Sequence, residues 1–118
     1  MFIQCLHEWR AIKERGDLVW ADFDPATGHG QMGRRPALVL SPGIFNKKML
    51  LALVAPVISR VRGHGFEVAV NGKKISGVAL CHQIKMIDFL ERGLQFVERA
   101  PKSSVSEALA KVKAIVVE

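Results

Sequence analysis

The sequence predicts a mainly β protein of the α+β class, in which a small antiparallel barrel carries helices packed on it. Short apolar segments of strand length recur along the chain, and turn-forming residues separate them at intervals of roughly eight to twelve residues. One amphipathic helix follows these segments at the C-terminal end. Several short strands closed by one such helix are typical of a small barrel.

Each predicted strand is either a short apolar run or a segment in which apolar and polar residues alternate. The predicted strands are 18–23, 36–40, 49–57, 66–70, 77–81, 84–87 and 94–97. The run at 49–57 is the most apolar of them, so we expect a central strand that is covered on both faces. Asn71-Gly72 is the strongest hairpin signal, because this pair favours the tight turn that joins two antiparallel strands.

Three further segments have helical patterns. Near the C-terminus, Ser104 and Glu107 have the spacing of a capping box, which predicts that a helix begins there. The apolar face of this helix contains Val105, Ala108, Leu109, Val112, Ile115 and Val116. Residues 44–48 are long enough for one helical turn, and residues 1–15 form an N-terminal arm with a helical pattern ahead of the main domain, 16–118.

The composition indicates a folded protein with a polyanionic partner. Of its 118 residues 49% are apolar, which excludes a disordered chain, and no run approaches the roughly 18 apolar residues of a membrane span. The N-terminus lacks a secretory pattern, so we expect a cytoplasmic protein. Cys5 and Cys81 have no metal-binding or redox spacing, so we expect reduced thiols and no metal. The net charge of +6 favours contacts with phosphates.

A glycine-rich polar loop leads into one of the buried strands and presents two arginines. Residues 28–42 read GHGQMGRRPALVLSP, so Arg35 stands directly before Pro36 at the mouth of the strand. A loop that delivers a charged side chain to the end of a buried strand is a common way in which a rigid scaffold holds a reactive group. Arg35 is therefore a candidate site residue, although an arginine at a strand start can also be simply solvated.

This loop is part of a longer likeness to a known family. The stretch GDLVWADFDPATGHGQMGRRPALVLSP, residues 16–42, closely resembles the opening of the MazF/PemK toxin family. The likeness continues through Phe45-Asn46, residues 54–56, 63–68 and 77–80, and then Gln83, Lys85, Ile87 and Asp88. With the C-terminal helix it covers roughly residues 16 to 117.

The resemblance implies an SH3-like barrel of the MazF/PemK/CcdB plasmid-maintenance-toxin type that forms a homodimer. It also implies the toxin of a type II toxin–antitoxin system: a metal-independent endoribonuclease without cofactor, which a cognate MazE-like antitoxin holds inactive. Such an enzyme cleaves single-stranded mRNA at selected sequences and leaves a 2′,3′-cyclic phosphate and a 5′-hydroxyl. It implies no membrane partner.

The implied reaction needs a base for the 2′-hydroxyl proton, an acid for the departing 5′ oxygen and a cation that faces the phosphorane. Arg35 matches the family's catalytic arginine, and its planar fork can meet two phosphate oxygens while it stays charged. His29 matches a loop histidine that some members use for proton transfer, for which an ordinary pKa of about 6.5 is well suited.

Two positions depart from the family pattern. Ile58 stands where the family has a threonine, and Ser59 matches the hydroxyl residue that follows it. A shift of one residue along a strand turns a side chain to the opposite face, so Ser59 is not an automatic substitute. His82 stands where the family has an aspartate, and Leu80 replaces the arginine that pairs with this aspartate in some members.

Two hypotheses follow from these departures. Either His29 and His82 serve as acid and base beside Arg35, or the protein is a catalytically weak or inactive member that acts as a module for binding RNA or antitoxin. A third possibility, a gyrase poison like the CcdB branch, is disfavoured because RPALVLSP around Arg35 resembles the nuclease branch.

The candidate residues fall into two groups. Those for catalysis are Arg35, Ser59, His29 and His82. Those for RNA binding are Gln31, Arg34, Lys47, Lys48, Arg60, Arg62, His64 and Gln83. Trp20 and Phe23 could stack on RNA bases, but aromatic residues of strands usually lie in the core, and we expect both of them there.

Overall fold

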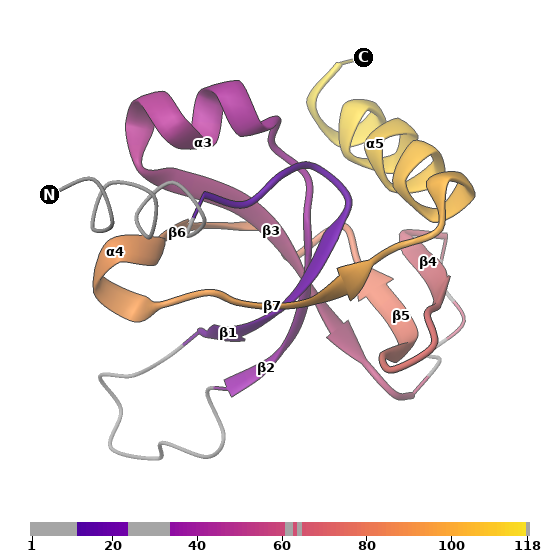
Figure 1. Cartoon of the computed structure of the whole chain (residues 1–118). Helices are drawn as coiled ribbons and strands as arrows, with labels where there is room; N and C mark the ends of the chain where they lie inside the picture. Colours follow the sequence, from indigo (N-terminus) through magenta and orange to yellow (C-terminus); the bar gives the residue numbers. More distant parts are fainter. Residues whose placement is uncertain (1–11, 24–33, 61–62, 64, 118) are drawn as a thin grey trace, which may run out of the picture.

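The computed structural model of the protein describes residues 12–23, 34–60, 63 and 65–117, which contain seven strands and three helices (Figure 1). The strands are β1 (Asp17–Asp22), β2 (Arg34–Val39), β3 (Leu51–Ile58), β4 (Glu67–Asn71), β5 (Ser76–Leu80), β6 (Lys85–Asp88) and β7 (Gln95–Arg99). The helices are α3 (Gly43–Met49), α4 (Phe89–Arg92) and α5 (Lys102–Val116). Every strand predicted from the sequence is present, with ends shifted by one or two residues.

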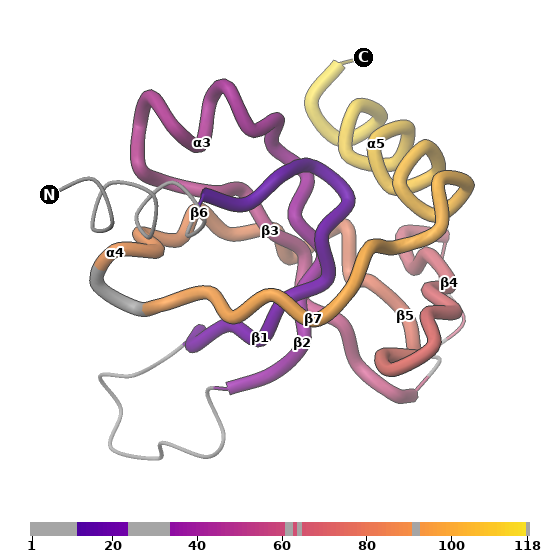
Figure 2. The backbone as a smooth tube through the Cα atoms, in the orientation of Figure 1, coloured from indigo at the N-terminus to yellow at the C-terminus, as the bar shows by residue number. Residues whose placement is uncertain are grey.

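The strands form one curled antiparallel sheet, as the backbone path in Figure 2 shows. Its strand order is β4-β5-β3-β2-β1-β7, and β6 pairs with β3 beside this path. A small antiparallel barrel with helices packed on it is therefore confirmed as the fold class. The hairpin predicted at Asn71-Gly72 joins β4 to β5, and Asn71 pairs with Ser76 at its closed end.

Strand β3 is the centre of the sheet, as its apolar sequence predicts. One of its edges pairs with β2, through Val54, Ala55 and Pro56. Its other edge is divided, because residues 51–54 pair with β6 and residues 57–58 pair with β5. A single strand thus joins the two halves of the barrel, and its C-terminal end lies between β2 and β5.

The core consists of two apolar clusters on opposite faces of β1, β2 and β3. The cluster beneath α5 contains Leu18, Leu38, Leu40, Ala55, Val57, Val68, Val70, Ile75, Ala79, Cys81 and Ala108. The second contains Val19, Ala21, Phe23, Ala37, Val39, Ala52, Val54, Ile87, Phe89 and Leu94. Cys81 is a free, buried thiol, as predicted, and burial raises its pKa to about 11, so that the thiol stays protonated. Cys5 and the rest of residues 1–11 lie outside the described residues.

Helix α5 differs from its prediction at the first turn. The residue at its N-cap is Pro101, without a side-chain cap hydrogen bond, and Ser104 lies inside the helix. The predicted capping box is therefore wrong. The Ser104 hydroxyl is buried and donates to the carbonyl of Ala69 on β4, at 2.8 Å, so it fastens α5 to the sheet instead of capping the helix. Figure 1 shows α5 beside β4.

The apolar face predicted for α5 is only partly covered. Ala108 is buried, and Val105, Leu109 and Val112 pack against the core, but Ile115 and Val116 are exposed. The prediction for the two aromatic residues of the first strand is likewise half right. Phe23 is buried, whereas Trp20 is 36% exposed.

Candidate active site

An open pocket lies where the start of β2, the end of β3 and the start of β5 meet. Its volume is about 390 Å³, and it is lined by Arg34, Arg35, Pro36, Val57, Ile58, Ser59 and Ser76. Among the residues that the structure describes, this lining contains two guanidinium groups, two hydroxyl groups and no carboxylate. An open pocket with this set of groups attracts anions, and guanidinium and hydroxyl groups are suitable donors to phosphate oxygens.

Strand β2 positions the two arginines. Arg34 and Arg35 stand opposite Asp22 and Ala21 of β1, which fixes the start of β2 against its neighbour. The Arg34 guanidinium donates from Nη2 to Oε1 of Gln95 on β7, at 2.8 Å. Arg35 is half-buried at the pocket. Both arginines therefore line the pocket from the start of β2.

Strands β3 and β5 approach each other closely at the opposite wall. Ile58 pairs with Val78, and a Cβ atom on Gly77 would lie 2.2 Å from the carbonyl oxygen of Ile58. Only glycine permits this approach, because no side chain fits in that space. The result is that Ser76, the residue before Gly77, stands at the pocket beside Ile58 and Ser59.

The pocket brings together some of the residues predicted from the sequence. Arg34, Arg35 and Ser59 all line it, and Arg60 is exposed one residue beyond Ser59. Ser76 was not predicted. It carries no local signal, since the pocket joins residues from three strands that lie far apart in the sequence. Four predicted site residues lie outside the described residues: His29, Gln31, Arg62 and His64.

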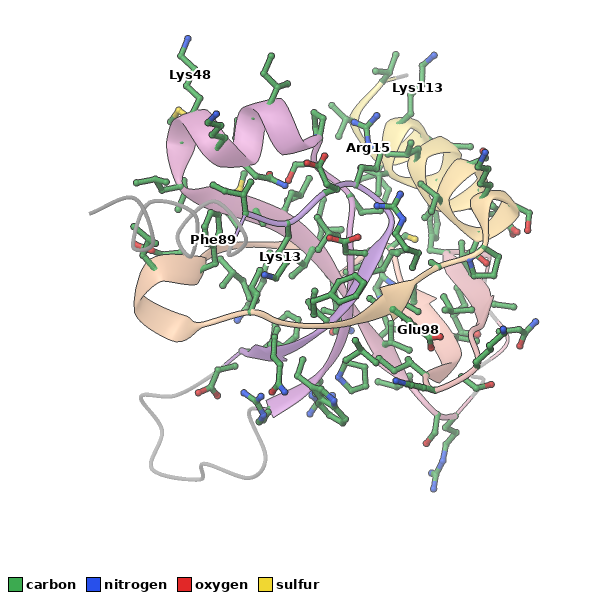
Figure 3. The ribbon with its side chains drawn as sticks, in the orientation of Figure 1. Lys13, Arg15, Lys48, Phe89, Glu98 and Lys113 are labelled. Atoms are coloured by element: carbon green, nitrogen blue, oxygen red, sulfur yellow. The ribbon has the colours of Figure 1, made fainter. Side chains whose placement is uncertain are left out.

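Other predicted residues lie elsewhere. His82 and Gln83 occupy the turn after β5, at the other end of that strand from Ser76, and they contact each other at 3.3 Å. Because six residues of extended chain span about 20 Å, this turn lies well away from Ser76. Neither side chain lines the pocket. Lys47 and Lys48 are exposed on α3, and Figure 3 shows Lys48 on the opposite side of the molecule from the start of β2 in Figure 1.

The described residues contain no cluster of three or more His, Cys, Asp or Glu side chains that could hold a metal ion. None of the helices in this part of the chain is both long and apolar enough to cross a membrane. The pocket with its arginines is thus the feature on which a function can be based.

A curled barrel with an open cationic pocket at its strand ends has the electrostatic character that suits the phosphate groups of a nucleic acid or another polyanion. The sequence adds the family. The model of the PemK-like, MazF-like toxins of type II toxin–antitoxin systems matches residues 14–116. The chain therefore belongs to this toxin family.

Individual relatives agree with this result. The endoribonuclease toxin MazF of Escherichia coli (strain K12) is 44% identical over 84 residues, which cover 71% of this chain and 76% of the relative. The crystal structure of MazF (Form-I) from Deinococcus radiodurans superimposes with a TM-score of 0.80 at 36% identity, and covers 91% of this chain and 98% of its own. A MazE–MazF crystal structure (Form-II) from the same organism has a TM-score of 0.77 at 33% identity, with coverages of 89% and 95%.

Proposed function

We propose that the protein is an mRNA interferase: a metal-independent endoribonuclease that cleaves single-stranded mRNA and leaves 2′,3′-cyclic phosphate and 5′-hydroxyl ends. The family supports the endoribonuclease class, because its curated relatives MazF, PemK and ChpB are named endoribonucleases. The observation that carries the finer proposal is the open pocket that Arg35 lines together with Ser59 and Ser76.

The pocket can supply the main electrostatic requirement of this reaction. The 2′-oxygen of the substrate attacks the adjacent phosphorus, the bond to the 5′-oxygen breaks, and a cyclic phosphate forms. Negative charge accumulates on the oxygens of the phosphorane, and donors held in place for that charge give the largest contribution to the rate. Arg35 can donate to two of these oxygens, and Ser59, which lines the same pocket, adds a hydroxyl donor.

Proton transfer requires two more groups. A base removes the 2′-hydroxyl proton and an acid returns a proton to the 5′-oxygen. His29, in the loop that precedes Arg34, is the candidate for one of these roles. His82 remains a candidate for the other, and the position of its turn, away from the pocket lining, requires that RNA or a second protomer bring it near the reacting atoms.

The proposed partners follow from the family and its solved complexes. A MazE-like antitoxin is the expected inhibitor, because MazF of Deinococcus radiodurans has been crystallised with MazE. We expect the protein to form a homodimer and to act in the cytoplasm, where its proposed substrate is found.

A second function, a module that binds RNA or antitoxin without fast cleavage, is favoured by one observation. Ile58 lines the pocket with an apolar side chain at the position where the resemblance implies a threonine. The two functions differ in whether RNA that binds is also cut.

The test is a cleavage assay on a long mixed-sequence RNA in the presence of EDTA, with protein freed of antitoxin. We expect discrete fragments that end in cyclic phosphate, and a loss of about 100-fold or more in rate for Arg35→Ala. Lys113→Ala is the matched control, because Lys113 is exposed on α5 and does not line the pocket. Binding without cleavage by the wild-type protein would favour the binding module, and equal rates for wild type and Arg35→Ala would refute the proposed site.

A further inference from the structure

We propose that Ser76 is a substrate-contacting residue of the pocket, whose hydroxyl donates a hydrogen bond to a phosphorane oxygen during cleavage, and that Glu98 is the residue that positions it. This inference rests on the proposed function. It assigns the hydroxyl that is held in position for the phosphorane to Ser76 on β5, instead of to Ser59, which follows β3.

Ser76 has the location that this role requires. It is exposed and lines the pocket together with Arg35 and Ile58. Gly77, the next residue, packs against the carbonyl oxygen of Ile58 with no space for a side chain, and so it holds the start of β5 at the pocket wall. A hydroxyl at this wall faces the same open space as the Arg35 guanidinium.

The turn that precedes Ser76 is held by a carboxylate from another strand. Glu98 on β7 accepts hydrogen bonds from three consecutive backbone amides: Lys73 at 3.1 Å, Lys74 at 2.8 Å and Ile75 at 2.8 Å. Figure 3 shows Glu98 on β7 beside the β4–β5 hairpin. These backbone hydrogen bonds hold the pKa of Glu98 below its ordinary value. We call this arrangement the Glu98 clamp.

The turn fits the clamp closely. The backbone amide of Gly72 donates to the carbonyl of Ile75 at 2.9 Å, which closes the turn on itself. A Cβ atom on Gly72 would lie 2.5 Å from Oε2 of Glu98, so a side chain there would collide with the carboxylate. Ser76 directly follows this turn and pairs with Asn71 across the hairpin. Its backbone is therefore fixed from β3, β4 and β7.

The second serine of the pocket lacks this support. Ser59 is exposed and lies one residue beyond the end of β3 at Ile58. A donor contributes most to the rate when it is already held in position for the charge of the transition state. The clamped Ser76 meets this condition better than Ser59. Its hydroxyl keeps its proton throughout, so the proposal adds no covalent or proton-transfer step.

The first experiment compares single-turnover cleavage and RNA affinity of wild type, Ser76→Ala and Ser103→Ala in EDTA. Ser103 is an exposed serine on α5 and serves as the matched control. We expect Ser76→Ala to lower the rate of the chemical step by about 100-fold with little change in RNA affinity, because the contact strengthens only in the transition state. Ser103→Ala should cleave like the wild type.

An isosteric pair excludes a packing effect. Threonine and valine side chains have the same shape, and both suit a strand position, but only Ser76→Thr retains a hydroxyl. We expect Ser76→Thr to cleave within about tenfold of the wild type and Ser76→Val to be as slow as Ser76→Ala. If the two variants are folded and equally slow, the hydroxyl is not the active group and the inference is wrong.

The positioning role of Glu98 is tested by a double-mutant cycle with Glu98→Gln and Ser76→Ala. We expect Glu98→Gln to slow the chemical step about tenfold when Ser76 is present, and to have no further effect when Ser76 is absent. A merely structural role of Glu98 would slow both proteins equally, and this result would refute the positioning role.

The outcomes separate this inference from the proposed function. If the wild type does not cleave, the proposed function fails, and if Arg35→Ala cleaves equally well, the proposed site fails; in both cases the role of Ser76 fails with it. If the wild type cleaves, Arg35→Ala does not, and Ser76→Ala remains within about threefold of the wild type, only the role of Ser76 is refuted.

Discussion

Ile58 shows how one residue can change which strand supplies a hydroxyl group to a pocket. Its apolar side chain occupies a wall at which a hydroxyl is implied by the family resemblance, and two serines from neighbouring segments stand beside it. Because the pocket draws residues from three strands, the same space can receive a hydroxyl from β3 or from β5. The chemistry of the site therefore depends on which strand is held most firmly, and here that strand is β5.

Asn46 is the residue on which the region around α3 depends. It is fully buried, its Nδ2 donates to the carbonyls of Lys13 at 2.7 Å and Ser41 at 3.1 Å, and its Oδ1 accepts from the Ser41 hydroxyl at 2.5 Å. The same hydroxyl accepts from the backbone amide of Leu53 at 2.8 Å. Asn46, together with Ser41, thus links the segment before β1, the segment before α3, α3 itself and β3.

We predict that Asn46→Ala lowers the free energy of unfolding by about 2–4 kcal/mol, because it leaves several buried polar groups without partners. Urea denaturation at one fixed protein concentration measures this change. Gln83→Ala is the control, since this amide is exposed, and it should stay within about 0.5 kcal/mol of the wild type. An Asn46→Ala protein as stable as the control would show that water can replace the network.

Single residues also show where sequence reasoning succeeds and fails. Arg35 could be found because its motif is local and its neighbours in the chain are distinctive. Trp20 was expected in the core, but only its neighbours Leu18 and Val19 are fully buried, in clusters on opposite faces of β1, whereas Trp20 is 36% exposed. Ser76 could not be found, because only the pairing of β3 with β5 brings it to Ile58.

Among the elements, the β4–β5 hairpin gives a prediction about pH. The Glu98 clamp holds the pKa of this carboxylate below the ordinary 4.5, chiefly through the backbone hydrogen bonds of Ile75 and Lys74. The unfolded chain therefore binds the proton at a higher pH than the folded protein does. The contribution of the clamp to stability is complete above the unfolded pKa, and it is lost as the pH falls through the lowered folded pKa.

We accordingly expect Glu98→Gln to lower Tm at neutral pH, and this difference from the wild type to shrink below about pH 4.5. Thermal unfolding followed by circular dichroism between about pH 3 and pH 7 measures the trend. Glu107→Gln, at an exposed position of α5, is the control and should follow the wild type at each pH. A Tm difference for Glu98→Gln that does not vary with pH would contradict the clamp.

Helix α5 explains why the limits of an element are harder to predict than its presence. The amphipathic pattern gave the helix correctly, and Ala108 is buried as expected. The capping box failed because Ser104 finds a better acceptor in the carbonyl of Ala69 on β4, which a local pattern cannot reveal. Tertiary contact thus decided the use of a hydroxyl whose spacing favoured a cap.

For the whole molecule, the excess of 17 Lys and Arg over 11 Asp and Glu predicts salt-dependent RNA binding. If Arg34, Arg35 and Arg60 each contact one phosphate, the logarithm of the association constant should fall with the logarithm of salt concentration with a slope of about −2. Binding of a 2′-O-methyl RNA, which cannot be cleaved, measures this slope. Arg60→Ala should reduce it by about 0.7.

The same measurement tests the lysines of α3. Lys48 lies on the opposite side of the molecule from the start of β2. If RNA binds only at the pocket, Lys48→Ala should therefore have the same salt slope as the wild type. A smaller slope for this variant would support the sequence-based assignment of Lys47 and Lys48 to the RNA-binding surface. A slope near zero for the wild type would contradict phosphate contacts altogether.

Strand β7 has a consequence for the time at which the protein becomes competent during its synthesis. Asp17 on β1 is bound by Arg99 on β7, 82 residues later in the chain, and the Glu98 clamp comes from the same strand. At translation rates of about 5–20 residues per second, β1 waits about 4–16 s for this partner. The described residues that line the pocket have been synthesised before then, but Glu98, which holds the turn before β5, has not. A growing chain that has not reached residue 99 therefore carries the arginines of the site without β7, the strand that holds the turn before Ser76 in place. The pocket can be completed only when synthesis has passed residue 99.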